Sequence, residues 1–385
     1  MKKLLFLLII FTTNAFSAPI KEYITSNYSL SEEKNKKLYP FVYFDLKSDT
    51  FYQKVKSKND DNSNQYFYTR SDLNINLNLN ENFSINSAFK AHKVKGFEAF
   101  NLTNTNERAF YGTAITVQDL NLSFNFDRVK IYLGKFDAKF GAGSERWSDY
   151  FFDSWYGING TAFNQKYTLQ EKIGIKIDAL LNESESSKVN VEISAFANDN
   201  TILFRKPFSF EREIPGFFAP SGEQRLAGGT SSVSSFSLSL QGYTQGLRAR
   251  DVISFNLGFK KQASENKTNE LGYTFATQYT AIFFNDFTMT SFLEYAKIKN
   301  AYALQDFNET FLTGSFALGF AGLKFGVLKN YYKMNFLEKQ NENYYEYFAG
   351  FEVPKTNFGV FIAKNNYKST ENYSGFTLNI RFRIN

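Results

Sequence analysis

The chain has 385 residues and a formal net charge of +6, with no Cys and a single His. Without Cys it can form no disulfide and use no thiol chemistry, and one His cannot supply a histidine-based metal cluster. The basic residues are scattered and form no dominant run, so the composition carries no sign of nucleic-acid binding.

Aromatic residues are abundant, although the chain is hydrophilic on average. Phe, Tyr and Trp make up 18% of the residues, yet the mean hydropathy is −0.37. The apolar residues must therefore be interleaved with polar ones instead of being pooled in long apolar runs. This arrangement favours a β-sheet with one apolar face and one wet face.

Residues 1–17 have the features of a secretory signal peptide. Lys2 and Lys3 precede an apolar run, and Ala15 and Ser17 occupy the −3 and −1 positions of a cleavage site after Ser17. The apolar run is too short to cross a bilayer as a helix. We therefore predict a cleaved signal peptide over residues 1–17, followed by a flexible periplasmic leader over residues 18–38.

From residue 39 onward, segment after segment alternates apolar and polar residues. In the clearest example, Leu73, Ile75 and Leu77 alternate with polar residues such as Asp72. No later stretch is apolar for long enough to form a transmembrane helix, so a membrane form of this chain has to be a barrel. Sixteen alternating segments can be counted, at residues 39–55, 66–80, 83–90, 109–126, 129–136, 168–181, 189–195, 233–243, 247–261, 271–284, 287–297, 309–320, 323–332, 344–353, 358–367 and 373–384.

The connections between these segments alternate in length. Every other connection, starting with the second, is short. The connections between these short ones mostly run longer, and two are very long, at residues 134–163 and 199–232. Short turns at one rim and long loops at the other are typical of bacterial outer-membrane barrels, and sixteen strands leave an aqueous lumen. We predict an all-β, closed antiparallel transmembrane barrel of about sixteen strands over residues 39–385. The short connections are 81–82, 127–128, 183–187, 244–246, 285–286, 321–322 and 354–357.

The segment 134–163 interrupts this pattern. It holds both Trp residues of the chain and three acidic residues spaced four apart, Glu145, Asp149 and Asp153. Its many aromatic side chains could form a stacking surface for sugars or for aromatic solutes. Alternatively, they could fix the loop against the barrel wall, which we favour because so many aromatic groups cannot all stay in water.

The start of this segment, Gly134-Lys135-Phe136-Asp137-Ala138-Lys139-Phe140-Gly141, resembles the G-x-F-x-x-P-F-G entry to the third long loop of sixteen-stranded porins of Gram-negative outer membranes. Lys139 stands where proline is common. The alternation over nearly the whole chain is similar to that family too, although the chain ends in Asn385 and not in the usual aromatic residue. In the family this loop folds inward and narrows the pore. The resemblance thus implies a constriction loop that carries Glu145, Arg146, Asp149, Asp153, Trp147 and Trp155.

The period-2 pattern also predicts which charges face the lumen. If Leu73, Ile75 and Leu77 meet lipid, Arg70 and Asp72 of the same segment line the lumen. The opposite orientation is unfavourable, because Arg or Lys facing lipid at the bilayer midplane costs about 2–4 kcal/mol. Inward-facing basic residues opposite the acidic loop would create a transverse electric field across the narrowest part of the pore. The alternative is that they are ordinary solvated charges of a wet lumen. The predicted basic wall consists of Arg70, Lys90, His92, Arg381 and Arg383.

Catalysis on lipids would require a Ser–His pair oriented by a third polar group on the lipid face. The only His, His92, is predicted to face the lumen, so we expect no enzyme activity, no metal and no cofactor. The porin resemblance implies passive diffusion of small hydrophilic solutes and ions, a homotrimer, and contact with outer-membrane lipid and lipopolysaccharide. The alternatives are a channel that prefers a sugar, an amino acid or an anion, and a non-channel barrel such as an adhesin.

Overall fold

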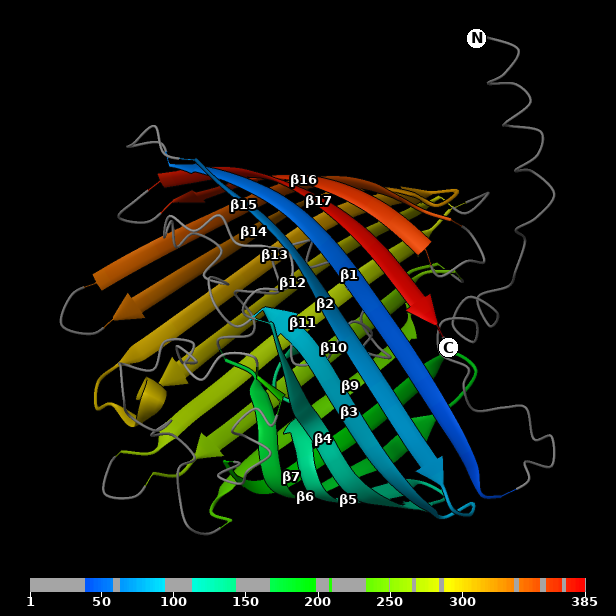
Figure 1. The fold of residues 1–385 in the computed structure, drawn as a ribbon. Helices are drawn as coiled ribbons and strands as arrows, with labels where there is room; N and C mark the ends of the chain where they lie inside the picture. Colours follow the sequence, from blue (N-terminus) through cyan, green and yellow to red (C-terminus); the bar gives the residue numbers. More distant parts are fainter. Residues whose placement is uncertain are drawn as a thin grey trace.

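The computed structural model describes residues 39–57, 63–93, 113–142, 167–198, 208–209, 233–248, 250–264, 268–283, 287–335, 339–353, 358–368 and 372–384. The predicted signal peptide and leader, residues 1–38, lie outside these described residues. Sixteen long strands build one antiparallel sheet (Figure 1). Among the described residues, no helix has the length and apolar character needed to cross a membrane.

The long strands are β1 (Phe41–Ser57), β2 (Ser63–Asn78), β3 (Phe83–Lys93), β4 (Thr113–Phe126), β5 (Val129–Ala138), β6 (Leu169–Glu183), β7 (Ser187–Asn198), β9 (Ser235–Gln245), β10 (Val252–Gln262), β11 (Glu270–Ile282), β12 (Thr288–Lys299), β13 (Asn308–Phe320), β14 (Leu323–Asn335), β15 (Lys339–Glu352), β16 (Phe358–Lys368) and β17 (Asn372–Ile384). Two short elements accompany them. One is the two-residue strand β8 (Phe208–Ser209), and the other is the 3-10 turn η3 (Ala301–Ala303).

The sheet closes on itself because its first and last strands pair. β1 and β17 are antiparallel, in a register that runs from Leu46 opposite Ile384 to Ser57 opposite Tyr373. β7 pairs directly with β9, so the ring is complete without the short strand β8. The predicted closed antiparallel barrel is therefore confirmed.

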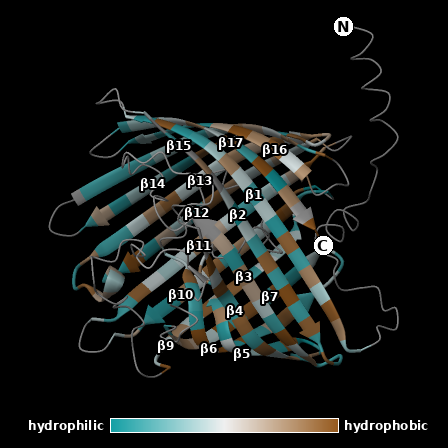
Figure 2. Ribbon diagram, viewed as in Figure 1, coloured by the Kyte–Doolittle hydropathy of each residue, from teal (hydrophilic) through white to brown (hydrophobic). Residues whose placement is uncertain are grey.

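The two faces of the sheet differ as the period-2 pattern predicts. In β1, Val42 and Phe44 are 61% and 51% exposed on the outer face, whereas Asp45 and Asp49, which follow them in the strand, are buried on the inner face. Figure 2 shows the same alternation of hydrophobic and hydrophilic residues along the strands. An apolar outer surface around a polar interior is the arrangement that a membrane-spanning barrel requires. In β17 the exposed outer residues are Phe376, Ile380, Phe382 and Ile384.

Most strand ends lie within a few residues of the predicted ones. The two-residue turn 321–322 is confirmed, with positive φ angles of 48° at Ala321 and 85° at Gly322, as a type I′ hairpin turn requires. The predicted strand start at residue 247 is wrong, because β10 begins only at Val252. Leu247 is 89% exposed in a longer turn, which an ion pair of 2.9 Å between Arg248 and Asp251 closes.

The sequence pattern did not reveal a bulge in β4. Ala88 of β3 pairs with Asp119, but the next residue, Phe89, pairs with Val117, so Gln118 is an extra residue. A bulge of this kind changes which residues of the strand face inward. Beyond the bulge, the other edge of β4 pairs with β8, through Ile115 opposite Phe208.

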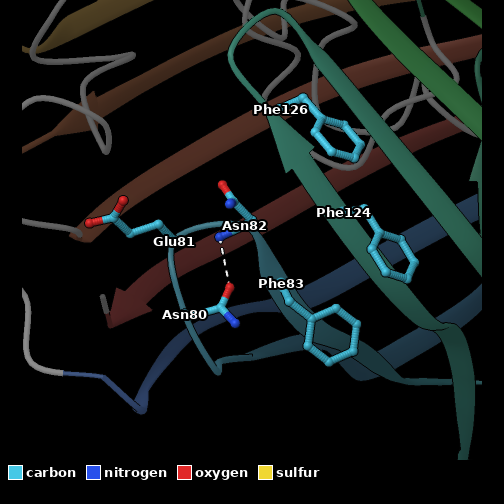
Figure 3. A pocket seen from close by; sticks show the side chains of 6 residues that line it. All are labelled: Asn80, Glu81, Asn82, Phe83, Phe124 and Phe126. Atoms are coloured by element: carbon cyan, nitrogen blue, oxygen red, sulfur yellow. Dashed lines mark hydrogen bonds between the residues drawn. The ribbon is translucent and has the colours of Figure 1, made fainter.

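A shallow pocket lies on the outer surface at the short-turn rim (Figure 3). The hairpin turn between β2 and β3 forms one side of it, where the Asn82 N–H donates a hydrogen bond of 2.9 Å to the Asn80 side-chain oxygen. The rings of Phe83 and Phe124, 5.2 Å apart, form another side. Because its walls are turn residues and outward-facing phenylalanines, this pocket is separate from the lumen.

Candidate functional site: the charged lumen

Asp49 lies between two arginines on the inner face of β17, β1 and β2. Its carboxylate is 3.5 Å from the guanidinium of Arg70 and 3.5 Å from that of Arg381, and it is only 1% exposed. Arg381 also donates a hydrogen bond of 3.1 Å to Asn379 and stacks 4.6 Å from the ring of Phe361. Arg70 and Arg381, two of the three predicted arginines, therefore face the lumen and share one carboxylate.

Lys90 lies in the next row of the lumen wall. In the register of the sheet, Lys47 of β1 is opposite Asp72 of β2, and Asp72 is opposite Lys90 of β3. Residues that pair directly across strands share one face of the sheet, so Lys90 faces the lumen beside Asp72. The backbones of His92 and Arg383 belong to β3 and β17, but their side chains lie outside what the structure describes.

The predicted basic wall therefore contains acidic residues as well. Asp45 and Asp49 are interleaved with the bases, and Lys47 lies 3.8 Å from Asp45. Sequence reasoning missed these three residues, although they alternate with Val42 and Phe44 in a period-2 pattern that should have revealed them. A wall of alternating sign gives strong local fields but a weaker long-range potential than a purely basic wall.

All the residues that we predicted for the constriction loop, Glu145, Arg146, Trp147, Asp149, Asp153 and Trp155, lie outside the described residues. The structure describes the two ends of the segment that carries them, residues 139–142 and 167–168. The position of the acidic loop relative to the arginines therefore remains a prediction.

The first of these ends follows the inner wall. The Lys139 N–H donates a hydrogen bond of 2.7 Å to Glu192 of β7, and the Ala142 N–H donates one of 2.8 Å to Glu294 of β12. Both carboxylates are almost completely buried, at 2% and 1% exposure. Between them Phe140 is fully buried. Residues 139–142 thus run inside the barrel from the face of β7 to the face of β12.

The second end meets the same part of the wall. The Lys260 ammonium on β10 donates a hydrogen bond of 3.0 Å to the Tyr167 carbonyl and forms an ion pair of 2.7 Å with Glu270. It also lies 4.8 Å from the ring centre of Phe140. The Tyr167 ring packs 4.9 Å from that of Phe311 on β13. Both described ends of the segment are therefore inside the barrel, against β10–β13.

The inner wall around these two ends is tightly packed. On β9, the inward Ser235, Ser237 and Ser239 are each 1% exposed. On β14 and β15, the ion pair of Lys324 with Glu352 keeps side-chain exposures of 24% and 42%. The buried apolar cluster around the two ends consists of Phe136, Ala138, Phe140, Tyr167, Leu169, Phe196, Ala296, Ile298, Ala301, Phe307, Phe311 and Tyr332.

Sequence reasoning missed a further charge cluster on β5–β7. The Lys176 ammonium lies 4.0 Å from Glu192 and 4.5 Å from the ring centre of Tyr132. Lys176 stands between Ile175 and Ile177, which is the signal that would have placed it in the lumen. Among the described residues, no group of three or more His, Asp or Glu side chains could hold a metal ion.

No protein family and no curated protein sequence matches the chain. Solved structures do. OprB of Pseudomonas putida superposes with a TM-score of 0.59 at 12% identity, covering 89% of this chain and 94% of that one. A loop L8 deletion mutant of OmpT, an outer membrane protein of Vibrio cholerae, gives 0.52 at 9% identity, covering 89% and 99%. OccAB2 of Acinetobacter baumannii gives 0.47 at 11% identity, covering 89% and 98%. At identities this low the first two likenesses show the fold alone, which is a closed antiparallel β-barrel.

Proposed function

We propose that this protein is an outer-membrane porin through which small hydrophilic solutes and ions diffuse passively. The observation that carries the proposal is the separation of the two faces of one closed ring. Charged and polar side chains occupy the inner face of the strands, and the large exposed apolar side chains occupy the outer face. A sixteen-stranded ring is wide enough to leave a water-filled passage.

The lumen wall supports passage of ions and dipolar solutes in physical terms. Arg381, Lys324 and Glu352 remain partly exposed, so they offer charges that replace some of a solute's hydration shell. Residues 139–142 and 167–168, which flank the segment 143–166, occupy part of the cross-section against β7 and β10–β13. We propose that this segment sets the narrowest point and that its acidic residues face the arginines across the remaining opening.

Recording from the purified full-length protein in a planar lipid bilayer tests the proposal. We expect stepwise openings whose conductance rises in proportion to the salt concentration, as diffusion through a wet pore requires. A protein that inserts, as judged by protease protection of its strands, but gives no current steps contradicts the proposal and favours a non-channel barrel such as an adhesin.

A channel that prefers one class of solute is the second candidate. It is favoured by the many aromatic residues of the segment 134–163, which would form a stacking surface for a sugar or an aromatic solute if they face the lumen. Saturation of solute flux, and block of the ion current by a sugar, an amino acid or phosphate, would support this candidate over general diffusion.

Four finer points belong to the same proposal. Residues 1–17 are removed as a signal peptide during export, the barrel assembles as a homotrimer, its outer surface contacts outer-membrane lipid and lipopolysaccharide, and it is not an enzyme. Mass spectrometry of the mature N-terminus tests the first point, and chemical cross-linking in intact membranes tests the second.

A further inference from the structure

The loop between β12 and β13, residues 300–307, turns onto the inner wall of the barrel. The Tyr302 N–H donates a hydrogen bond of 2.8 Å to Glu270, a buried residue on the inner face at the start of β11. Ala301 and Phe307 of the loop belong to the buried apolar cluster around the two ends of the segment 143–166. This loop and those two ends therefore meet on one part of the lumen wall.

The backbone of the loop 300–307 has an unfavourable conformation. Four of its residues that are not glycine have φ angles between 52° and 62°, in the left-handed region. Residues with side chains disfavour this region, and such a conformation persists only where surrounding contacts hold it. The hydrogen bond from Tyr302 to Glu270 is one of these contacts, and the packing of the Tyr302 ring 5.7 Å from that of Phe307 is another. The four residues are Asn300, Tyr302, Ala303 and Asp306.

Glu270 connects this loop to the two ends through Lys260. One carboxylate oxygen of Glu270 accepts the hydrogen bond from Tyr302, and the other lies 2.7 Å from the Lys260 ammonium. Lys260 in turn donates its hydrogen bond to the Tyr167 carbonyl and lies over the ring of Phe140. Both charged side chains are almost completely buried, at 3% exposure for Lys260 and 7% for Glu270. A single ion pair thus contacts both ends of the segment and the loop.

The wall beneath Lys260 leaves space for the ring of Phe140. Gly272 of β11 is opposite Lys260 of β10 in the register. A Cβ atom on Gly272 would lie 2.8 Å from both the Phe140 ring and the Lys260 stem, so a side chain there would displace them. Because the glycine lets the ring and the stem pack closely, Lys260 has little freedom to move without moving Phe140.

We propose that Lys260 and Glu270 are positioning residues that couple the loop 300–307 to the two ends of the segment 143–166. Removing either charge leaves the other buried without its counter-charge, which is unfavourable enough to turn that side chain towards water. Loss of Glu270 therefore frees the ends held by Lys260, and loss of Lys260 frees the loop held by Glu270. The inference rests on the proposed function, because coupling makes the loop 300–307 a second element that sets the width of the pore.

Thiol labelling of the full-length protein in detergent micelles tests the coupling. The chain has no Cys, so one introduced Cys is its only thiol. Ala142→Cys places the reporter on the first end, and Ala303→Cys places it in the loop, at sites that are 3% and 2% exposed. The rate of reaction with a maleimide then measures how often each part leaves the wall. Each reporter is combined with Lys260→Met or with Glu270→Gln, which remove one charge and keep a side chain of similar length.

We expect each of these two changes to raise the labelling rate at both reporters, by roughly tenfold. The decisive results are the crossed ones. Lys260→Met should expose the reporter at residue 303, and Glu270→Gln should expose the reporter at residue 142. Labelling that rises only in the part which the altered residue itself contacts would overturn the coupling, and so would unchanged labelling at both reporters. The control Glu352→Gln breaks the ion pair with Lys324 and should leave both rates unchanged.

Hydrogen exchange of the unmodified protein tests the same point without altering either charge. Peptides that cover residues 139–142 and 300–304 should show equal protection, because coupled parts open as one unit. Unequal protection would overturn the coupling even if the charge variants failed to fold. Conductance in planar bilayers separates this inference from the proposed function. Open channels with independent labelling of the two reporters refute only the coupling, and linked labelling without current refutes only the porin.

Discussion

The carboxylate of Glu294 on β12 accepts a hydrogen bond of 2.8 Å from the backbone N–H of Ala142, a residue that follows β5 in the chain. Around the ring, β6, β7, β9, β10 and β11 stand between these two strands. A buried N–H group needs a partner, and Glu294, at 1% exposure, supplies one where no strand edge is available. The barrel thus uses an inward carboxylate to fix a segment that passes through its own lumen.

Replacing this carboxylate should loosen that segment. In Glu294→Ala the Ala142 N–H loses its acceptor, which costs on the order of 1–3 kcal/mol for a buried donor. We expect a noisier open-channel current with an altered mean conductance, measured in planar bilayers. The control Glu352→Ala removes a lumen carboxylate that is paired with Lys324. It should change the conductance without added noise, and equal noise in the two variants would contradict the anchoring role.

Asp49 should set the balance of charge on the lumen wall. Its carboxylate lies 3.5 Å from both Arg70 and Arg381, so Asp49→Asn leaves two arginines without their shared counter-charge. The reversal potential in a salt gradient should move towards anion selectivity. Arg381→Gln should move it the other way. A shift in the same direction for both variants would show that neither residue acts through its charge.

Gly350 should be required because a phenyl ring covers it. It pairs with Phe361 of the neighbouring strand, and a Cβ atom on Gly350 would collide with that ring. Gly350→Ala should destabilise the barrel by about 1–3 kcal/mol, as expected for overpacking. Urea unfolding in detergent measures this change. In a protein that already carries Phe361→Ala, the further change Gly350→Ala should cost less stability than it does in the unmodified protein. Equal costs in the two proteins would exclude the steric explanation.

The closed ring could be predicted from the sequence because its signal is local and repeated. Alternation such as that of Leu73, Ile75 and Leu77 determines both the presence of a strand and the face that each residue occupies. Short turns were predicted where turn chemistry is distinctive, as at Ala321 and Gly322, whose backbones both have positive φ. The arginines on the lumen wall, Arg70 and Arg381, followed from the same alternation.

Contacts that join distant parts of the chain could not be predicted in this way. Nothing in the sequence near Ala142 indicates Glu294 as its partner, because the contact depends on how the closed ring brings β12 to that point. The bulge at Gln118 also depends on pairing with β3 rather than on a local pattern. The sequence therefore predicted which charged residues face the lumen, whereas the contacts between those residues could be seen only in the structure.

The turn between β9 and β10 should respond to acid. There the Arg248 guanidinium donates hydrogen bonds to Asp251 and lowers the pKa of that carboxyl, with a further hydrogen bond from Tyr279. A lowered pKa in the folded state means that the ionised form stabilises the fold. This contribution is present at neutral pH and is lost as the pH falls below the ordinary carboxyl pKa of about 3.9.

Unfolding midpoints measured between neutral and acidic pH test this turn. Asp251→Asn should lower the midpoint at neutral pH and should have little effect once the carboxyl of the unmodified protein is protonated. Asp306→Asn, in the exposed loop before β13, provides a matched change of a carboxyl to an amide. If the two variants have the same pH dependence, the turn makes no contribution of its own.

The segment between residues 134 and 163 gives the sharpest test of selectivity. If Glu145, Asp149 and Asp153 face the lumen wall, the triple change to Gln, Asn and Asn removes three negative charges from the narrowest part of the pore. Cation entry then loses its electrostatic advantage, so the reversal potential should move towards anions, and more at low salt because salt screens the interaction. Neutralising Glu183 and Glu185, at the turn between β6 and β7, serves as the control for charge removal outside the lumen. A triple variant whose selectivity equals that of the unmodified protein at every salt concentration would remove these residues from the constriction.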